Sequence, residues 1–221
     1  MIRLAVFDMA GTTVNDRDEV YRVLREATER EGARYSDETF QQWMGTEKNH
    51  AIGQLLRVGG VEVTDEIHGR AWQWFREELA RTYTAHPPVA LDGIPEALGE
   101  LRSRGIRIGL TTGFSREIVD LILGSMGWEI EFTAASDEVA EGRPAPLLIQ
   151  RIMEQTGITD PAEVISVGDT AADVRSAQRA GVTSVGVLTG HLSSAEFKEL
   201  GADLILDSVA DLPAHPVMGD R

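Results

Sequence analysis

The 221-residue sequence contains no cysteine and only two lysines, Lys48 and Lys198. Without cysteine, the protein can have no disulfide framework, thiol nucleophile or cysteine-bound metal. Acidic residues outnumber basic ones by 36 to 21, and the net charge of −15 argues against nucleic acid or an anionic membrane as the main partner. The sequence has neither a signal-peptide pattern nor an apolar run of membrane-spanning length, so we expect a cytoplasmic protein.

Apolar runs alternate with helical patterns along most of the chain. This alternation predicts an α/β fold: a Rossmann-like, doubly wound parallel sheet with helices on both faces. The expected strands are residues 4–7, 106–110, 130–135, 164–167, 183–187 and 202–206. We assign residues 1–15 and 87–212 to this catalytic core.

Residues 16–86 contain only helical patterns, between the first strand and the Pro87-Pro88 pair. They predict an inserted all-α domain, with helix starts capped by Ser36, Thr46 and Thr64. In the core, Ser115 is expected to cap another helix in the same way. Residues 213–221 are predicted to form a loose C-terminal tail.

Polar residues follow three of the expected strands: Asp8, the pair Thr111-Thr112, and Asp169. Because the carboxyl ends of parallel strands meet at one edge of a sheet, these groups are expected to converge there. Two carboxylates at one edge repel, and a divalent cation such as Mg²⁺, which prefers oxygen ligands, relieves the repulsion. The sequence therefore predicts a magnesium site at this edge.

Together with Thr112, the residues Gly113, Arg143 and Asp173 complete a phosphate site beside these carboxylates. Thr112 and Gly113 offer a hydroxyl and exposed N–H groups for phosphate oxygens. Arg143, in a Gly-Arg-Pro turn, supplies a cation that neutralises a transferring phosphoryl group. Asp173 lies one helical turn beyond Asp169 and is expected to hold a ligand water or an arginine.

Four segments make the chain similar to a known family along essentially its whole length: residues 8–13 (DMAGTT), 111–117 (TTGFSRE), 141–144 (EGRP) and 167–173 (VGDTAAD). They resemble the haloacid dehalogenase superfamily and, within it, the phosphonatase (phosphonoacetaldehyde hydrolase) family. The resemblance implies that the helical insertion is a cap domain that closes over the site. It also implies a homodimer formed through the cap.

The same resemblance implies a role for each matching residue. Asp8 would be the nucleophile that takes the phosphoryl group, and Arg143 would replace the family's usual lysine. Magnesium would be bound by Asp8, the Ala10 carbonyl and Asp169, with Asp173 ordering its surroundings. Contacts to substrate or phosphate would come from five residues: Thr12, Met44, Thr111, Thr112 and Gly113.

Ala10 separates this chain from the ordinary phosphatases of the superfamily. Those enzymes place a second Asp two residues after the nucleophile, where it protonates a leaving alkoxide, a contribution of roughly 10²–10⁴ in rate. A carbon leaving group held as an enamine does not need this acid. Ala10 therefore counts against a general phosphomonoesterase.

Lys48 supports the same interpretation. The spacing in Met44-Gly45-Thr46-Glu47-Lys48 is similar to the cap segment whose lysine forms a Schiff base with an aldehyde. A protonated imine stabilises the carbanion that leaves when a C–P bond breaks. The helix dipole and Arg143 are expected to lower the pKa of Lys48, while Glu47 opposes them. The competing interpretation is a solvated helix residue, the usual environment of lysine.

Two positions depart from the phosphonatase pattern: Ala51 stands in place of a histidine and Phe114 in place of a tyrosine. A substituted 2-oxoalkylphosphonate is therefore as compatible with the sequence as phosphonoacetaldehyde itself. Two other functions remain open: a phosphatase for a small organic phosphate monoester, and a non-catalytic phosphate-binding or regulatory protein.

Overall fold

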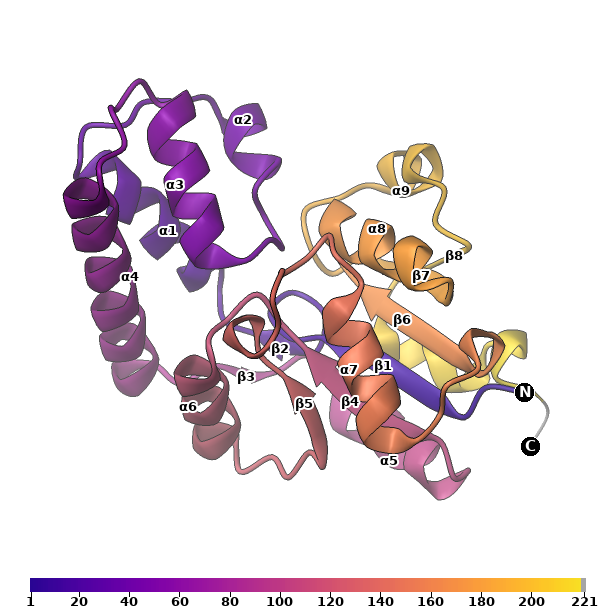
Figure 1. Ribbon diagram of the computed structural model, residues 1–221. Coiled ribbons are helices and arrows are strands. Elements are labelled where there is room, and N and C mark those ends of the chain that lie inside the picture. Colours follow the sequence, from indigo (N-terminus) through magenta and orange to yellow (C-terminus); the bar gives the residue numbers. More distant parts are fainter. Residues whose placement is uncertain (220–221) are drawn as a thin grey trace.

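A computed structural model describes residues 1–219 of the chain. Its main sheet has six strands in the order β5-β4-β1-β6-β7-β8, and all neighbouring pairs are parallel (Figure 1). The strands are β1 (Leu4–Asp8), β4 (Arg107–Thr111), β5 (Phe132–Ala134), β6 (Val164–Gly168), β7 (Thr183–Val187) and β8 (Leu204–Leu206). The sequence-based prediction of a Rossmann-like parallel sheet is confirmed.

Helices cover both faces of this sheet because the central strand is apolar on both sides. Leu4 and Val6 of β1 pack in one cluster with Leu148 and Ile152, and Ala5 and Phe7 pack in the other, which includes Leu98. The core helices are α5 (Ile94–Ser103), α6 (Arg116–Met126), α7 (Leu147–Thr156), α8 (Ala171–Ala180) and α9 (Ser194–Leu200).

The insertion contains four helices that stand beside the sheet in Figure 1. They are α1 (Glu19–Glu29), α2 (Asp37–Gln41), α3 (Lys48–Val58) and α4 (Asp65–Ala85), and all lie within residues 16–86. We call this unit the cap. A two-stranded antiparallel ladder of β2 (Val14–Asn15) and β3 (Val89–Ala90) joins the cap to the core. Two-residue strands leave no periodic pattern, so the sequence analysis missed this ladder.

Two of the expected helix caps differ in the structure. Helix α3 is capped by the Glu47 carboxylate, which accepts hydrogen bonds from Asn49 N (2.7 Å) and His50 N (2.6 Å), and not by Thr46. The Thr46 hydroxyl donates instead to the Trp43 carbonyl. Ser115 occupies the N-cap position of α6, but its hydroxyl makes no capping bond.

The prediction of a loose tail is wrong for residues 213–219. Short 3-10 helices at Val209–Ala214 and Pro216–Met218 hold this segment, and Pro213 and Met218 are buried. Leu212 and Met218 belong to the main apolar cluster, so burial of their side chains orders the segment. Residues 220–221 of the predicted tail lie outside the described residues. Within residues 1–219, no helix combines the length and apolarity needed to cross a membrane.

Candidate active site

The predicted convergence of polar residues at one sheet edge is present. Asp8 ends β1 opposite Thr111, the last residue of β4, and β6 pairs with β1 on its other side. Asp169 follows the last residue of β6 directly. Asp8, Asp169 and Asp173 are all buried, and one carboxylate oxygen from each lies within 4.8 Å of the others.

Arg143 lies between two of these carboxylates. Its Nη2 donates to Asp8 Oδ1 at 2.5 Å, and its Nη1 donates to Asp173 Oδ1. The guanidinium is buried, and a planar fork suits two carboxylates better than an ammonium would. Arg143 comes from the loop before α7, so only folding brings it to Asp8.

The Asp173 carboxylate already has partners on both sides. In addition to Arg143, its Oδ2 accepts from Thr170 N at 3.1 Å, and Thr170 Oγ1 accepts from Asp173 N at 3.3 Å, which together cap α8. These bonds direct Asp173 toward Arg143 and the helix end. Its position agrees with a residue that orders its neighbours and does not itself take a ligand.

The residues present fit a divalent cation. Burial and the charge of Asp8 raise the pKa of Asp169 to about 7, although Thr12 Oγ1 donates to Asp169 Oδ1 at 2.7 Å. Burial and the neighbouring carboxylate both disfavour the charged form of Asp169, and a cation would offset both effects. Asp8 and Asp169 offer carboxylate oxygens to Mg²⁺ here, and the Ala10 carbonyl stays a predicted third ligand.

Lys48 is buried in the structure, which contradicts the interpretation of a solvated residue. It begins α3, and its Nζ donates to the Thr46 carbonyl at 2.8 Å. The ring centroids of Tyr21 and Phe114 lie 5.8 and 5.9 Å from Nζ. Lys198, by contrast, is exposed on α9.

Burial, and to a smaller extent the charge of Arg143, lower the pKa of Lys48 to about 8 against the opposing charges of Asp8, Glu47 and Asp16. The sequence analysis expected the direction from the helix dipole and Arg143. The largest cause is desolvation, which the local sequence does not reveal. A lysine with this pKa is partly neutral near neutral pH, as a nucleophilic amine must be.

One small cavity brings the predicted catalytic groups together. Its lining includes Asp8, Lys48 and Arg143, with Ala10, Thr112 and Gly113 also on its wall. Its volume is about 10 Å³, roughly the space of one water molecule, so the cap is closed over the site. At Gly113 an added Cβ would come 2.6 Å from the Thr46 carbonyl oxygen and 3.1 Å from Lys48 Nζ. Glycine is therefore required where the cap meets this strand end.

Three predicted contact residues lie elsewhere. Thr12 donates its hydroxyl to Asp169, and buried Thr111 is not among the residues that line this cavity. Met44 lines a neighbouring pocket of about 30 Å³ with Tyr21 and Asp169. Direct contact of these three residues with a substrate therefore stays a prediction.

Tyr21 is a residue of this site that the sequence analysis missed. It comes from cap helix α1 and lines the cavity beside Asp8 and Lys48. Burial raises the pKa of its phenol well above the usual value, and so do the charges of Asp169, Asp8 and Asp16. The phenol therefore stays protonated and offers a hydrogen bond. Its position beside the buried face of α1, one residue after Val20, was the only sequence signal.

The fold and the site define the class of protein. A sequence profile of the haloacid dehalogenase-like hydrolases matches residues 2–181, and the chain belongs to this family. It is therefore a hydrolase of the haloacid dehalogenase family.

More specific similarity comes from individual relatives. A phosphonoacetaldehyde hydrolase from Bacillus cereus (strain AH187) is 30% identical over 207 residues, which cover 86% of this chain and 76% of the relative. A phosphonoacetaldehyde hydrolase-like protein from Oleispira antarctica superposes with a TM-score of 0.82 at 23% identity, covering 100% of this chain and 95% of that one.

A protein assigned as a phosphoglycolate phosphatase, from Lactobacillus delbrueckii subsp. bulgaricus, superposes almost as well. Its TM-score is 0.81 at 19% identity, with 99% of each chain covered. At such identities the structural similarity establishes the fold alone.

Proposed function

We propose that this protein hydrolyses the C–P bond of phosphonoacetaldehyde or a related 2-oxoalkylphosphonate. The observation that carries the proposal is the placement of Lys48 in one cavity with Asp8 and Arg143. A phosphate ester needs no amine at this position, whereas cleavage of a C–P bond needs an electron sink on the neighbouring carbon. The similarity to phosphonoacetaldehyde hydrolases supports the same substrate class.

Lys48 starts the reaction in this proposal. Its neutral amine attacks the carbonyl carbon, water leaves, and a protonated imine forms. The lowered pKa of Lys48 provides the neutral amine, and its bond to the Thr46 carbonyl points Nζ toward the cavity that the cap encloses. The ring of Tyr21 lies beside this amine, with its centroid 5.8 Å from Nζ.

Asp8 then attacks phosphorus. The C–P electron pair moves to carbon, giving an enamine on Lys48 and an aspartyl phosphate on Asp8. Protonation of the enamine carbon and hydrolysis of the resulting imine release the aldehyde or ketone and free Lys48, and a second water releases phosphate from Asp8. Arg143, bonded to Asp8 Oδ1 at 2.5 Å, orients the nucleophile and neutralises the transferring oxygens.

Mg²⁺, held by Asp8, Asp169 and the Ala10 carbonyl, would supply positive charge to the phosphoryl oxygens. Thr12 keeps the Asp169 carboxylate in place through a 2.7 Å hydrogen bond. Thr112 and Gly113 line the same cavity and offer a hydroxyl and an N–H to the phosphoryl group. Ala10 carries no acid, in agreement with a carbon leaving group that is protonated after it departs.

Borohydride trapping tests this proposal directly. The protein is incubated with phosphonoacetaldehyde and Mg²⁺, reduced, and mapped by peptide mass spectrometry. We expect one adduct, at Lys48, together with release of phosphate. Asp8→Asn should retain the adduct and lose phosphate release, since the imine forms before the C–P bond breaks.

Lys198→Ala is the matched control, because Lys198 is the chain's other lysine and is exposed. It should leave both adduct and phosphate release unchanged. Turnover of phosphate monoesters without any adduct at Lys48 would replace the proposal with a phosphatase. Full turnover by Asp8→Asn would remove the aspartyl phosphate from the mechanism.

A further inference from the structure

Asp16 is a buried acid that the proposed mechanism does not use. It lies in the linker that leads from the core into α1, and it is only 4% exposed. One carboxylate oxygen, Oδ2, accepts from the Tyr83 hydroxyl at 2.7 Å and from Val20 N at 3.0 Å, and Oδ1 accepts from Asp18 N at 3.2 Å. None of these donors is charged, and burial raises the pKa of Asp16 above its ordinary value.

Helix capping explains only part of this arrangement. Asp18 holds the N-cap position of α1 without a side-chain capping bond, and Asp16 takes over the free Val20 N–H. An exposed side chain could make the same bond. Burial of a carboxylate without an opposite charge is costly, and the bond to Tyr83 joins residues 67 positions apart. The added partner and the burial therefore indicate a further role.

The two donors on Oδ2 belong to the surroundings of the reaction cavity. Val20 and Tyr21 at the start of α1 line this cavity, and we call them the cap wall. Phe114, which we call the core wall, lines it from the end of β4. Tyr83, on the last turn of α4, packs edge-on against the ring of Phe114, with centroids 6.3 Å apart at 88°. One oxygen atom thus holds the cap wall directly and supports the core wall through Tyr83.

Lys48 depends on both walls. The ring centroids of Tyr21 and Phe114 lie 5.8 and 5.9 Å from its Nζ, and desolvation is the largest cause of its lowered pKa. A displaced wall would admit water and return the pKa of Lys48 toward its ordinary value of 10.5. The negative charge of Asp16 acts in the opposite sense, since it raises the pKa of Lys48. Loss of the charge and loss of the hydrogen bonds therefore have effects of opposite sign.

We propose that Asp16 is a positioning residue for Lys48: its Oδ2 ties the start of α1 to Tyr83 and so fixes the cap wall and the core wall that keep water from the amine. This inference rests on the proposed role of Lys48 in imine formation and deepens it. Asp16 does not line the reaction cavity and acts through the residues that do.

The two lysines of the chain make this proposal measurable without substrate. Protein labelled with ¹³C at lysine Cε gives two NMR signals, and Lys198→Ala identifies the one that belongs to Lys48. Titration of this signal reports the pKa of Lys48 directly. Four charged groups act on this amine and stay in place during the comparison, apart from the one that is changed: Arg143, Asp8, Glu47 and Asp16.

The decisive comparison is between Asp16→Asn and Asp16→Ala. Both variants lack the negative charge, but the amide oxygen of asparagine can still accept from Tyr83 and Val20, whereas alanine offers no acceptor. We expect Asp16→Asn to titrate at or slightly below the midpoint of the unaltered protein. The midpoint of Asp16→Ala should lie at least about one pH unit above that of Asp16→Asn, and its borohydride-trapped adduct should form about tenfold more slowly at pH 7.

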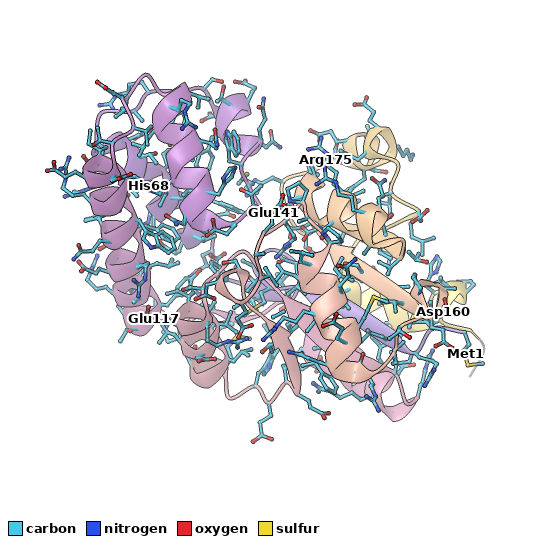
Figure 2. All side chains as sticks on the ribbon, in the orientation of Figure 1. Met1, His68, Glu117, Glu141, Asp160 and Arg175 are labelled. Atoms are coloured by element: carbon cyan, nitrogen blue, oxygen red, sulfur yellow. The ribbon has the colours of Figure 1, made fainter. Side chains whose placement is uncertain are left out.

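Glu117→Gln is the matched control, because it removes another carboxylate that connects the cap with the core. Glu117 on α6, labelled in Figure 2 beside the lower end of α4, pairs with Arg76 at 2.5 Å, and both side chains are exposed. This variant should leave the midpoint of Lys48 unchanged. If circular dichroism shows that Asp16→Ala does not fold, Tyr83→Phe added to Asp16→Asn removes one of the two bonds without opening a cavity. It should also raise the midpoint above that of Asp16→Asn.

Equal midpoints in Asp16→Asn and in the folded variant that lacks the bond to Tyr83 overturn the proposal. A lower melting temperature with such equal midpoints would assign Asp16 to stability alone. Failure of the proposed function is distinct, because it appears as a missing Lys48 adduct in the unaltered protein, whatever the Asp16 variants show.

Discussion

At the residue scale, Lys48 shows how position changes the chemistry of a side chain. The burial that removes it from water, beside the rings of Tyr21 and Phe114, also favours its neutral form. The opposing charges of Asp8 and Glu47 keep its pKa at about 8 and prevent a larger shift. The residue is thus held where both protonation states are populated near neutral pH.

This placement predicts the pH dependence of adduct formation. With a pKa of about 8, the neutral fraction of Lys48 rises about tenfold from pH 7 to pH 9 and then levels off. The rate of borohydride-trapped adduct should follow the same curve. A solvated lysine, with its pKa near 10.5, would instead give a rise of about a hundredfold over that range without a plateau.

At the element scale, the loop between α2 and α3 closes the site. Its residues meet three core loops at glycine contacts: Gly45 faces Thr170, Thr46 faces Gly113, and Glu47 faces Gly142. Since the reaction cavity admits little more than one water, this loop must move away before substrate enters. The cap is joined to the core by one linker before α1 and another after α4. Arg17 in the first linker connects the two, because its Nη2 donates to the carbonyls of His86 (2.7 Å) and Pro87 (3.2 Å) in the second.

Gly45→Ala should block this closure. Gly45 has a φ of +75°, and an added Cβ would overlap the Thr170 side chain. We expect kcat/KM to fall by about two orders of magnitude, as for a misplaced catalytic group, with the fold retained in circular dichroism.

Gly60→Ala is the control for the backbone cost. Gly60 has a similar φ of +83° but nothing within 4 Å of the added Cβ. We expect Gly60→Ala to lose about as much folding stability as Gly45→Ala and to keep its activity. Equal activity of the two variants would mean that the loop does not dock during turnover.

At the scale of the whole molecule, folding brings three carboxylates together in a chain that already carries a net charge of −15. Asp169 has a higher pKa in the folded chain, about 7 against an ordinary 3.8. It therefore binds a proton more tightly when folded, and this contribution to stability is lost as pH rises from about 4 through 7. A divalent cation would restore it and would compete with the proton.

Mg²⁺ should therefore raise the melting temperature more at pH 8 than at pH 6. At about one hundred times its dissociation constant, the expected rise at pH 8 is about 5–10 °C. Asp169→Asn should abolish this rise, whereas Asp207→Asn, at an exposed aspartate, should keep it. A rise of equal size at both pH values, or one that persists in Asp169→Asn, would place the cation elsewhere.

The sequence by itself determined the parallel sheet, the helical insertion and the residues at the strand ends. These follow from local patterns: apolar runs bounded by turn residues, helical periodicity, and polar residues directly after Phe7, Leu110 and Gly168. Parallel strands must end at a common edge, so the convergence of Asp8 and Asp169 was predictable without coordinates. The prediction of a loose tail was wrong for residues 213–219, because the burial of this segment depends on core residues that lie far away in the sequence.

The tertiary structure alone decided how the cap lies on the core. Burial of Lys48, the approach of Tyr21 and the cleft of about 670 Å³ between the cap and the core all depend on contacts between segments far apart in the chain. Desolvation is a property of the surrounding volume, and periodicity within one helix carries no information about what packs over its end. The polar groups at the strand ends can therefore be predicted from the sequence, and the environment that the cap builds around them cannot.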